Sequence, residues 1–185
     1  MQRLAEGLGS GALPALEHLE ICDMPVYNAG TSALAAALGR GALPQLTSLT
    51  LFGAAIGNAE LKALAPALRQ LPALGSLDLM NNPLGDEGLA ALVAPPPPPA
   101  GAVSPPTGGL TMLERLNLDQ TQISDAGCVA LALALDSGAL PALFWVELRR
   151  IPASTAAKVA VQKAMQEHMA YYNMDARRPF GCIIE

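Results

Sequence analysis

Aromatic residues are scarce in this chain of 185 residues. One tryptophan, three tyrosines and three phenylalanines make up 4% of the sequence, although 51% of all residues are hydrophobic. The apolar residues are mainly leucine and alanine. A single globular core of this size usually needs more bulk than these side chains supply. A stack of thin, similar leucine layers does not, so the composition favours a repeat protein.

Clusters of basic residues are also lacking. The net charge is −5, acidic and basic residues are interspersed, and the nearest basic pairs are Arg149-Arg150 and Arg177-Arg178. Binding of nucleic acid requires clustered lysine and arginine that neutralise phosphates. The composition therefore argues against a nucleic-acid partner.

No segment suits a membrane span or an export signal. A long uncharged run, 88–113, contains Pro95 to Pro99 and Pro105-Pro106, which exclude a membrane-spanning helix. The first residues lack an apolar signal core, and the three cysteines have no paired spacing. We therefore expect a cytoplasmic protein in a reducing compartment, without membrane association.

Catalytic and metal-binding constellations are missing as well. His18 and His168 are the only histidines, and no nucleophile-base-acid set or glycine-rich phosphate loop accompanies them. His18, Glu20 and Cys22 alternate onto one strand face, but the outer two are about 13 Å apart, too far to share an ion. The sequence predicts no enzyme, no metal site and no cofactor.

A repeated unit is what the chain does contain, and residues 71–92 display it best. A leucine opens an LxxLxL core five times, with spacings of 30, 28, 39 and 30 residues, at Leu16, Leu46, Leu74, Leu113 and Leu143. Four of the five cores carry Leu-Pro just before this leucine. Inside each core, leucines alternate with mostly polar residues. This alternation predicts a short strand with one buried face.

A helix is predicted after each strand. Residue types that cap helix N-termini follow each core at a constant distance: Asn28, Asn58, Asp86, Asp125 and Thr155. Leucines then recur at spacings of three, four and seven, which places them on one helix face. No unit can bury that face alone, so the units must stack on one another.

These boundaries divide the chain into four parts. We expect a partial repeat at 1–12, five repeats at 13–152, a capping helix at 153–173 and a tail at 174–185. A proline-rich insertion at about 94–109 interrupts the array. Because the chain begins inside a predicted helix without a polar cap, we expect it to be a fragment of a longer protein. Cys128 is expected in the core, and Cys182 is expected to be an exposed thiol.

The pattern LxxLxLxxNxL followed by a helix, at 28 to 30 residues, resembles the ribonuclease-inhibitor-like class of leucine-rich repeats. That class includes NOD-like receptors and Ran GTPase-activating protein. The resemblance implies an α/β fold: a right-handed solenoid, or horseshoe, with a parallel β-sheet on the concave side and helices on the convex side. The class has Asn or Cys at a ladder position after each strand. Here only Asn82 matches and Thr121 is a substitute, whereas Met24, Ala54 and Ile151 depart from it.

The concave face is the expected binding surface, because its outward strand positions vary between repeats. A large aromatic beside arginines and carboxylates is typical of a protein-binding hot spot. The alternative is that Trp145 packs on the terminal helix as part of the cap. We predict a protein partner that contacts Asp78, Met80, Arg115, Asn117, Asp119, Trp145, Glu147 and Arg149.

Other functions remain open at this point. The resemblance also admits a GTPase-activating regulator, for which Asn82 and Arg149-Arg150 are the only polar candidates, or a fragment of a NOD-like-receptor-type sensor. The segment Pro95 to Pro99 is similar to ligands of SH3 or WW domains, and the alternative is a low-complexity loop.

Overall fold

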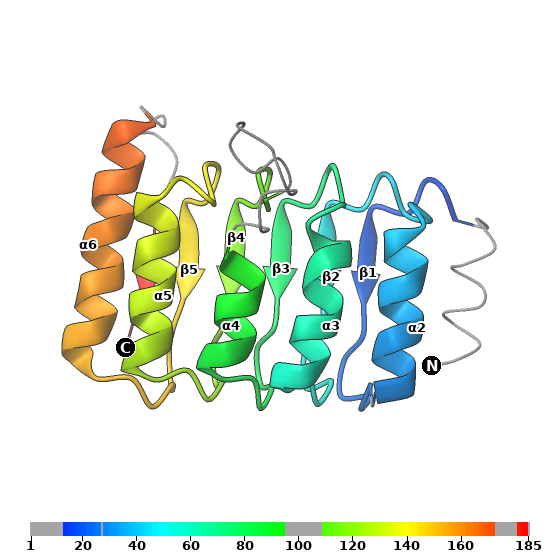
Figure 1. Ribbon diagram of the computed structural model, residues 1–185, viewed down its shortest axis with the longest axis horizontal. Helices are drawn as coiled ribbons and strands as arrows, with labels where there is room; N and C mark the ends of the chain where they lie inside the picture. Colours follow the sequence, from blue (N-terminus) through cyan, green and yellow to red (C-terminus); the bar gives the residue numbers. More distant parts are fainter. Residues whose placement is uncertain (1–12, 27, 95–108, 173–180, 185) are drawn as a thin grey trace, which may run out of the picture.

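The computed structural model describes residues 13–26, 28–94, 109–172 and 181–184. Short strands and helices alternate along the chain, as the repeat predicts (Figure 1). The strands are β1 (His18–Glu20), β2 (Ser48–Thr50), β3 (Ser76–Asp78), β4 (Arg115–Asn117), β5 (Trp145–Glu147) and β6 (Gly181–Ile183). The helices are α2 (Asn28–Gly39), α3 (Asn58–Leu68), α4 (Asp86–Val93), α5 (Asp125–Asp136) and α6 (Thr155–Tyr171).

The six strands form one parallel sheet in chain order. The helices all lie on one side of this sheet and leave the other side open (Figure 1). Each strand from β1 to β5 buries its middle residue against the helices and turns its first and third residues to the open side. The predicted α/β leucine-rich-repeat solenoid is confirmed, and the open side of the sheet is its concave face.

The core lies between the sheet and the helices, in layers of leucine. In the second repeat, Leu49 from the strand, Ile56 from the loop and Leu61 and Leu64 from the helix are fully buried. Burial of one such side chain contributes roughly 2 kcal/mol, so each layer supplies several units of that size. Cys128 takes one of these helix positions and is buried, as predicted.

The turn after each strand from β1 to β5 contains a residue with left-handed backbone. The φ angles at these equivalent positions are 50°, 57°, 58°, 56° and 55°, at Asp23, Gly53, Asn81, Gln120 and Arg150. Only Gly53 is a glycine, and a Cβ there would lie 2.6 Å from Oδ1 of Asp23. Four turns therefore hold a residue with a side chain in a conformation that costs about 1 kcal/mol, which the stacking of the repeats must offset.

Asn82 connects adjacent repeats in the way that the ladder position requires. The Ile56 N–H donates to Asn82 Oδ1 over 2.9 Å, and Asn82 Nδ2 donates to the carbonyls of Leu51, Leu79 and Met80. The side chain is 2% exposed, so it is entirely engaged within the fold. Thr121 is a weaker substitute because its hydroxyl donates to one carbonyl, that of Leu118.

Our expectation that Asn58, Asp86 and Asp125 cap their own helices is wrong. The N-cap positions of α3, α4 and α5 are occupied by Gly57, Gly85 and Ser124, and the acidic or amide residue is the first residue inside the helix. Thr155 is likewise the first residue of α6, which Ser154 caps. The side chains of Asn58, Asp86 and Asp125 point to the next repeat instead. The N–H groups of Gly85 and Gly88 donate to Asn58 Oδ1 over 2.7 and 3.1 Å.

Asp86 repeats this arrangement one unit further on. The N–H groups of Ser124 and Gly127 donate to its Oδ1 over 2.8 and 2.9 Å, and the Ser124 hydroxyl donates to its Oδ2. Asp125 likewise accepts from the backbone and hydroxyl of Ser154. Each side chain thus caps the helix of the following repeat, where a negative charge is also favoured by the helix dipole.

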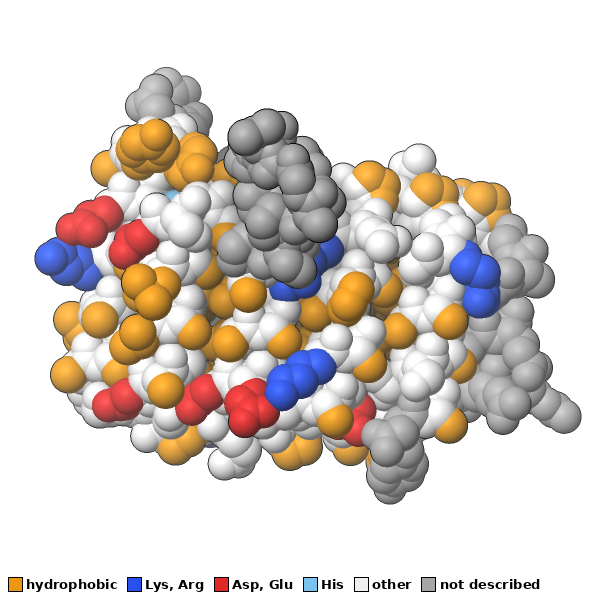
Figure 2. Space-filling view, viewed as in Figure 1, with side chains coloured by type: hydrophobic (Ala, Val, Ile, Leu, Met, Phe, Trp, Pro, Cys, Tyr) orange, Lys and Arg blue, Asp and Glu red, His pale blue; other side chains and the backbone are white. Residues whose placement is uncertain are grey.

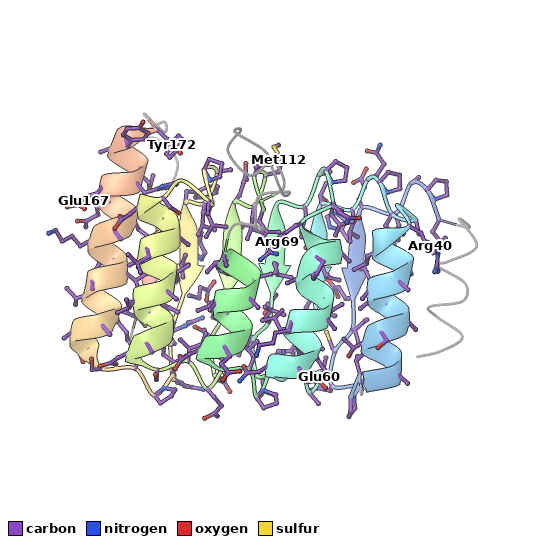
Figure 3. All side chains as sticks on the ribbon, viewed as in Figure 1. Arg40, Glu60, Arg69, Met112, Glu167 and Tyr172 are labelled. Carbon is purple, nitrogen blue, oxygen red and sulfur yellow. The ribbon has the colours of Figure 1, made fainter. Side chains whose placement is uncertain are left out.

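A similar connection is present at the other end of the helices. The guanidinium of Arg69, just after α3, donates to the carbonyls of Ala91, Leu92 and Ala94 at the end of α4 (Figure 3). These carbonyls have no partner inside their own helix. Neighbouring repeats are therefore joined by polar contacts at both helix ends as well as by the leucine core.

On the helix side of the molecule, hydrophobic side chains are scattered over the surface with few charged ones between them (Figure 2). Val129 and Leu133 on α5 are more than half exposed, and Val159 on α6 is nearly so. The acidic residues of the first helical turns, among them Glu60 and Glu87, lie along the edge where the helices begin. No helix in the described residues is long and apolar enough to cross a membrane.

Strand β6 was not expected from the sequence, which gave no structure for the tail. It adds to the edge of β5, and the N–H of Leu148 donates to the carbonyl of Ile183 over 2.8 Å. The expectation that Cys182 is an exposed thiol is wrong, because its side chain is half-buried against the core. The partial repeat at 1–12 and the proline segment Pro95 to Pro99 lie outside the described residues.

Candidate functional site

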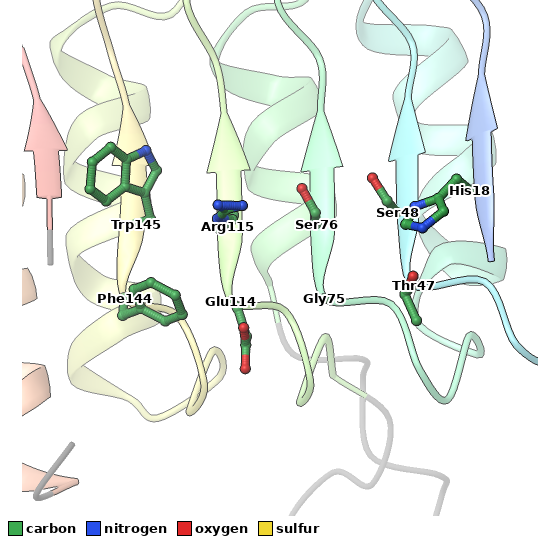
Figure 4. Close-up of a pocket in the computed structure, with 9 residues that line it drawn as sticks. All are labelled: His18, Thr47, Ser48, Gly75, Ser76, Glu114, Arg115, Phe144 and Trp145. Carbon is green, nitrogen blue, oxygen red and sulfur yellow. The ribbon is translucent and has the colours of Figure 1, made fainter. Parts of the chain in front are cut away.

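A row of side chains crosses the concave face from β1 to β5. The first residues of the five strands are in register and point to the same side: His18, Ser48, Ser76, Arg115 and Trp145 (Figure 4). We call this the first row. Together with the residues that precede them on β2 to β5, they line a groove with a volume of about 740 Å³.

The shape of the groove follows from side-chain size. Ser48, Ser76 and the adjacent Gly75 are small and form its middle, whereas Trp145 and Arg115 stand at one end and His18 at the other. Strands are about 4.8 Å apart, so the first row extends over about 19 Å. The groove is therefore long enough for a segment of a protein chain, and its walls stand on a rigid sheet.

A second row, formed by the third residues of the strands, is polar and linked by hydrogen bonds. Asn117 Nδ2 donates to Asp78 Oδ2 over 3.2 Å, and the Met80 N–H donates to Asp78 Oδ1 over 2.8 Å. The Asp119 N–H in turn donates to Asn117 Oδ1 over 3.0 Å. These contacts fix the orientation of Asp78 and Asn117 before any ligand arrives.

The expectation that Asp119 faces the partner is wrong. The structure places it in a third row, two residues beyond the strand, where it is 2% exposed. Its carboxylate accepts from the backbone N–H and from Nε of Arg149, both at 2.7 Å. A second guanidinium nitrogen of Arg149 pairs with Glu147. Asp119 is buried because this pairing compensates its charge, and it acts by positioning Arg149.

The pKa of Asp78 is raised above its ordinary value. Burial is the main cause, and the nearby carboxylates of Glu147 and Asp119 add to it. The hydrogen bonds from Met80 and Asn117 act in the opposite direction and do not outweigh these effects. Asp78 is therefore a carboxylate that a bound cation would stabilise.

Trp145 is held by contacts that the sequence did not indicate. Its indole N–H donates to Glu147 Oε1 over 3.0 Å. A Cβ on Gly181 would lie 2.6 to 2.9 Å from three ring carbons of Trp145, so the ring packs on the bare backbone of β6. The alternative that Trp145 packs on the terminal helix is thus replaced by packing on the terminal strand. The ring remains only half-buried and lines the groove.

The structure brings most of the predicted contact residues together. A second hollow of about 240 Å³ adjoins the groove and is lined in part by five of them: Asp78, Arg115, Asn117, Trp145 and Glu147. Met80 is half-buried beside Asn117, and Arg149 lies at the same end of the face. The prediction did not include the residues in the middle of the groove, because it selected large and charged side chains. The small residues Ser48, Gly75 and Ser76 at adjacent strand positions could have indicated a hollow there.

Metal binding and GTPase regulation find little support in the described part of the chain. No three His, Cys, Asp or Glu side chains there converge to hold a metal ion. Of the candidates for GTPase regulation, Asn82 is buried and bonded to backbone, and Arg149 is bound to two carboxylates. Arg150 is exposed in the turn after β5, in a different repeat from Asn82.

Comparisons with known proteins agree with this geometry. Residues 73–93 and 109–132 match the family model described as Leucine Rich repeat. The chain contains leucine-rich repeats. A search of curated proteins gives no significant match.

Solved leucine-rich-repeat-like domains show the same overall fold. One is leiomodin-1 actin-binding site 2, with a TM-score of 0.65 and 14% identity, covering 92% of this chain and 90% of that one. Another is the C-terminal domain of tropomodulin from Caenorhabditis elegans, with a TM-score of 0.66 and 17% identity, covering 94% and 95%. At these identities the similarity establishes the fold alone.

Proposed function

We propose that this leucine-rich-repeat chain is a protein-binding module that holds one partner on its concave face. The observation that carries the proposal is the groove of about 740 Å³, in which a half-buried Trp145 stands beside Arg115. Tryptophan and arginine are the residues that most often dominate binding energy at protein interfaces. Asp78, Asn117 and Glu147 surround them and supply polar contacts.

Preorganisation supports the same conclusion. Trp145 is fixed by Glu147 and Gly181, and Arg149 is fixed by Asp119, so binding does not have to order these side chains. Rigid contact residues raise affinity because less conformational entropy is lost on association. Met80 completes the set with a flexible apolar side chain.

The structural relatives support the class of function, not the partner. The leiomodin-1 domain is described as an actin-binding site, so a solenoid of this size and fold can bind a protein. Assignment to the ribonuclease-inhibitor-like class, supported by Asn82, and a cytoplasmic location, supported by unpaired cysteines, are part of this proposal. Docking of an SH3 or WW domain at Pro95 to Pro99 is not.

Affinity capture from a cell extract tests the module, with Trp145→Ala as the disruptive variant. Leu133→Ala, on the exposed face of α5, is the matched control because it removes an apolar side chain from the opposite side. We expect Trp145→Ala to weaken capture of the partner by about tenfold or more, and Leu133→Ala to leave it unchanged. Circular dichroism confirms that both variants fold. If Trp145→Ala keeps every captured protein while Leu133→Ala loses them, the concave site is wrong.

A further inference from the structure

Arg115, at the Trp145 end of the groove, has no ion-pair partner among the described residues. Its side chain is exposed on β4. It stands between Ser76 on β3 and Trp145 on β5 in the first row. A carboxylate that enters the groove there meets a guanidinium, the hydroxyl of Ser76 and the edge of an aromatic ring.

The second row and the adjacent Asp119 have the opposite imbalance. Asp78, Asp119 and Glu147 lie close enough to influence one another, and Arg149 is the only cation paired with any of them among the described residues. Asp119 and Glu147 use that guanidinium, whereas the donors to Asp78 within the described ranges are the Met80 backbone and the Asn117 amide. Asp78 is the carboxylate left over, and it lines the hollow that adjoins the groove.

The two positions have a fixed separation. Residues i and i+2 of a strand lie about 7 Å apart on the same face, which is the distance from the first row to the second. Alternate side chains of an extended peptide have the same spacing. A strand-like segment that lies along β3 and β4 therefore presents one side chain to Arg115 and the side chain two residues away to Asp78.

We propose that an extended segment of a partner protein lies along β3 and β4, across the groove and into the adjoining hollow, with an acidic side chain paired with Arg115 and a basic side chain two residues away paired with Asp78. This inference rests on the proposed protein-binding function and specifies its partner. Nucleic acid does not fit, because the second row would repel phosphates.

Selection from a phage-displayed library of random dodecapeptides on the immobilised full chain tests the pattern. The target variants are Arg115→Glu and the charge-swapped Asp78→Lys/Arg115→Glu. Lys163→Glu on α6 is a matched charge reversal, exposed and outside the groove. Wild type and Lys163→Glu should enrich the same sequences, which carry an acidic and a basic residue two positions apart in one constant order. Their synthetic peptides should bind Arg115→Glu about tenfold more weakly, and the charge-swapped chain should enrich sequences with the two charges in the reverse order.

Each contrary outcome has a distinct meaning. Peptides that lack the charge pattern but are lost with Trp145→Ala would overturn this inference and leave the protein-binding function standing. Enrichment of no peptide that depends on Trp145 would overturn both. Self-association of the wild type that Arg115→Glu abolishes would assign the groove to a second copy and overturn the inference. If the charge-swapped chain fails to fold, Asp78→Asn replaces it, and an unchanged preference for a basic residue then overturns the pairing.

Discussion

At the scale of single residues, the environment of each side chain decides its role more than its type does. Asp78 and Asp119 occupy similar places in the repeat pattern, yet one lines a hollow and the other is buried in an ion pair. The three cysteines differ in the same way. Cys22 is exposed, Cys128 is buried in the core, and Cys182 is half-buried on β6.

Thiol reactivity should follow this order. The pKa of the Cys128 thiol and of the Cys182 thiol is raised to about 11, chiefly by burial, which disfavours the thiolate. At pH 8 only about one in a thousand of these thiols is ionised, and the fraction rises about tenfold for each pH unit. We expect Cys22 to react first with a disulfide reagent such as dithionitrobenzoate. Slow phases from the other two should accelerate from pH 7 to pH 9.

Rate measurements on Cys22→Ser provide the control, because the fast phase should then vanish while the slow phases persist. A fast phase that remains in this variant would show that Cys182 is accessible and would contradict the burial of β6.

At the scale of the elements, the helix N-termini join one repeat to the next. Asp86 reaches the Gly127 N–H because that residue has no side chain: a Cβ there would lie 2.4 Å from Asp86 Oδ1. Asp125 does not reach the corresponding N–H of Ala157, which is bonded by the Ser154 hydroxyl instead. The glycine two residues after the acidic position therefore leaves room for the capping side chain of the preceding repeat.

Gly127→Ala should destabilise the protein by about 1 to 2 kcal/mol, because the new methyl group displaces the Asp86 cap. The same change should cost less in an Asp86→Ala background, because the cap is then absent and only the contact of the new Cβ with Ile123 Cγ2, at 2.7 Å, has to relax. Urea unfolding of the four proteins of this cycle measures both effects. Glu87→Ala, next to Asp86 but exposed, is the control. Additive effects in the cycle would rule out the cap between repeats.

At the scale of the whole molecule, the strand β6 extends the sheet beyond the fifth repeat, which the sequence did not indicate. Strand β6 has no leucine core of its own and contributes Cys182 at the position where β5 contributes Val146. Its Gly181 supports Trp145, which in turn lines the groove. The end of the solenoid and the proposed binding site therefore share one contact.

Gly181→Val tests that contact, because valine favours strand structure and yet its side chain collides with the indole ring. We expect the ring to move into solvent and its fluorescence to shift to longer wavelength. Trp145 is the only tryptophan in the chain, so the emission reports on this ring alone. Ile183→Val on the same strand is the matched control and should leave the spectrum unchanged. An unchanged spectrum with Gly181→Val would mean that β6 does not pack under Trp145.

The repeat itself was readable from the sequence. Leucines at fixed intervals, such as Leu46, Leu49 and Leu51, can be buried together only if each unit forms a strand and stacks on the next, so periodicity determined the strands, the helices and the concave face. The same periodicity placed Asp78, Arg115 and Trp145 on that face. The structural role of Asn82 was predictable because asparagine is the residue type expected at its position after the strand.

Other features depend on which repeat a side chain meets. Asp86 caps a helix 38 residues further along the chain, and Asp119 pairs with Arg149 30 residues away. Gly181 lies under Trp145 although its strand, β6, does not have the leucine pattern of a repeat. Sequence spacing carries information about contacts within a unit, where backbone geometry fixes the neighbours. Contacts between units depend on side-chain reach and on the absence of a side chain at the receiving residue, and these were decided only when the units stacked.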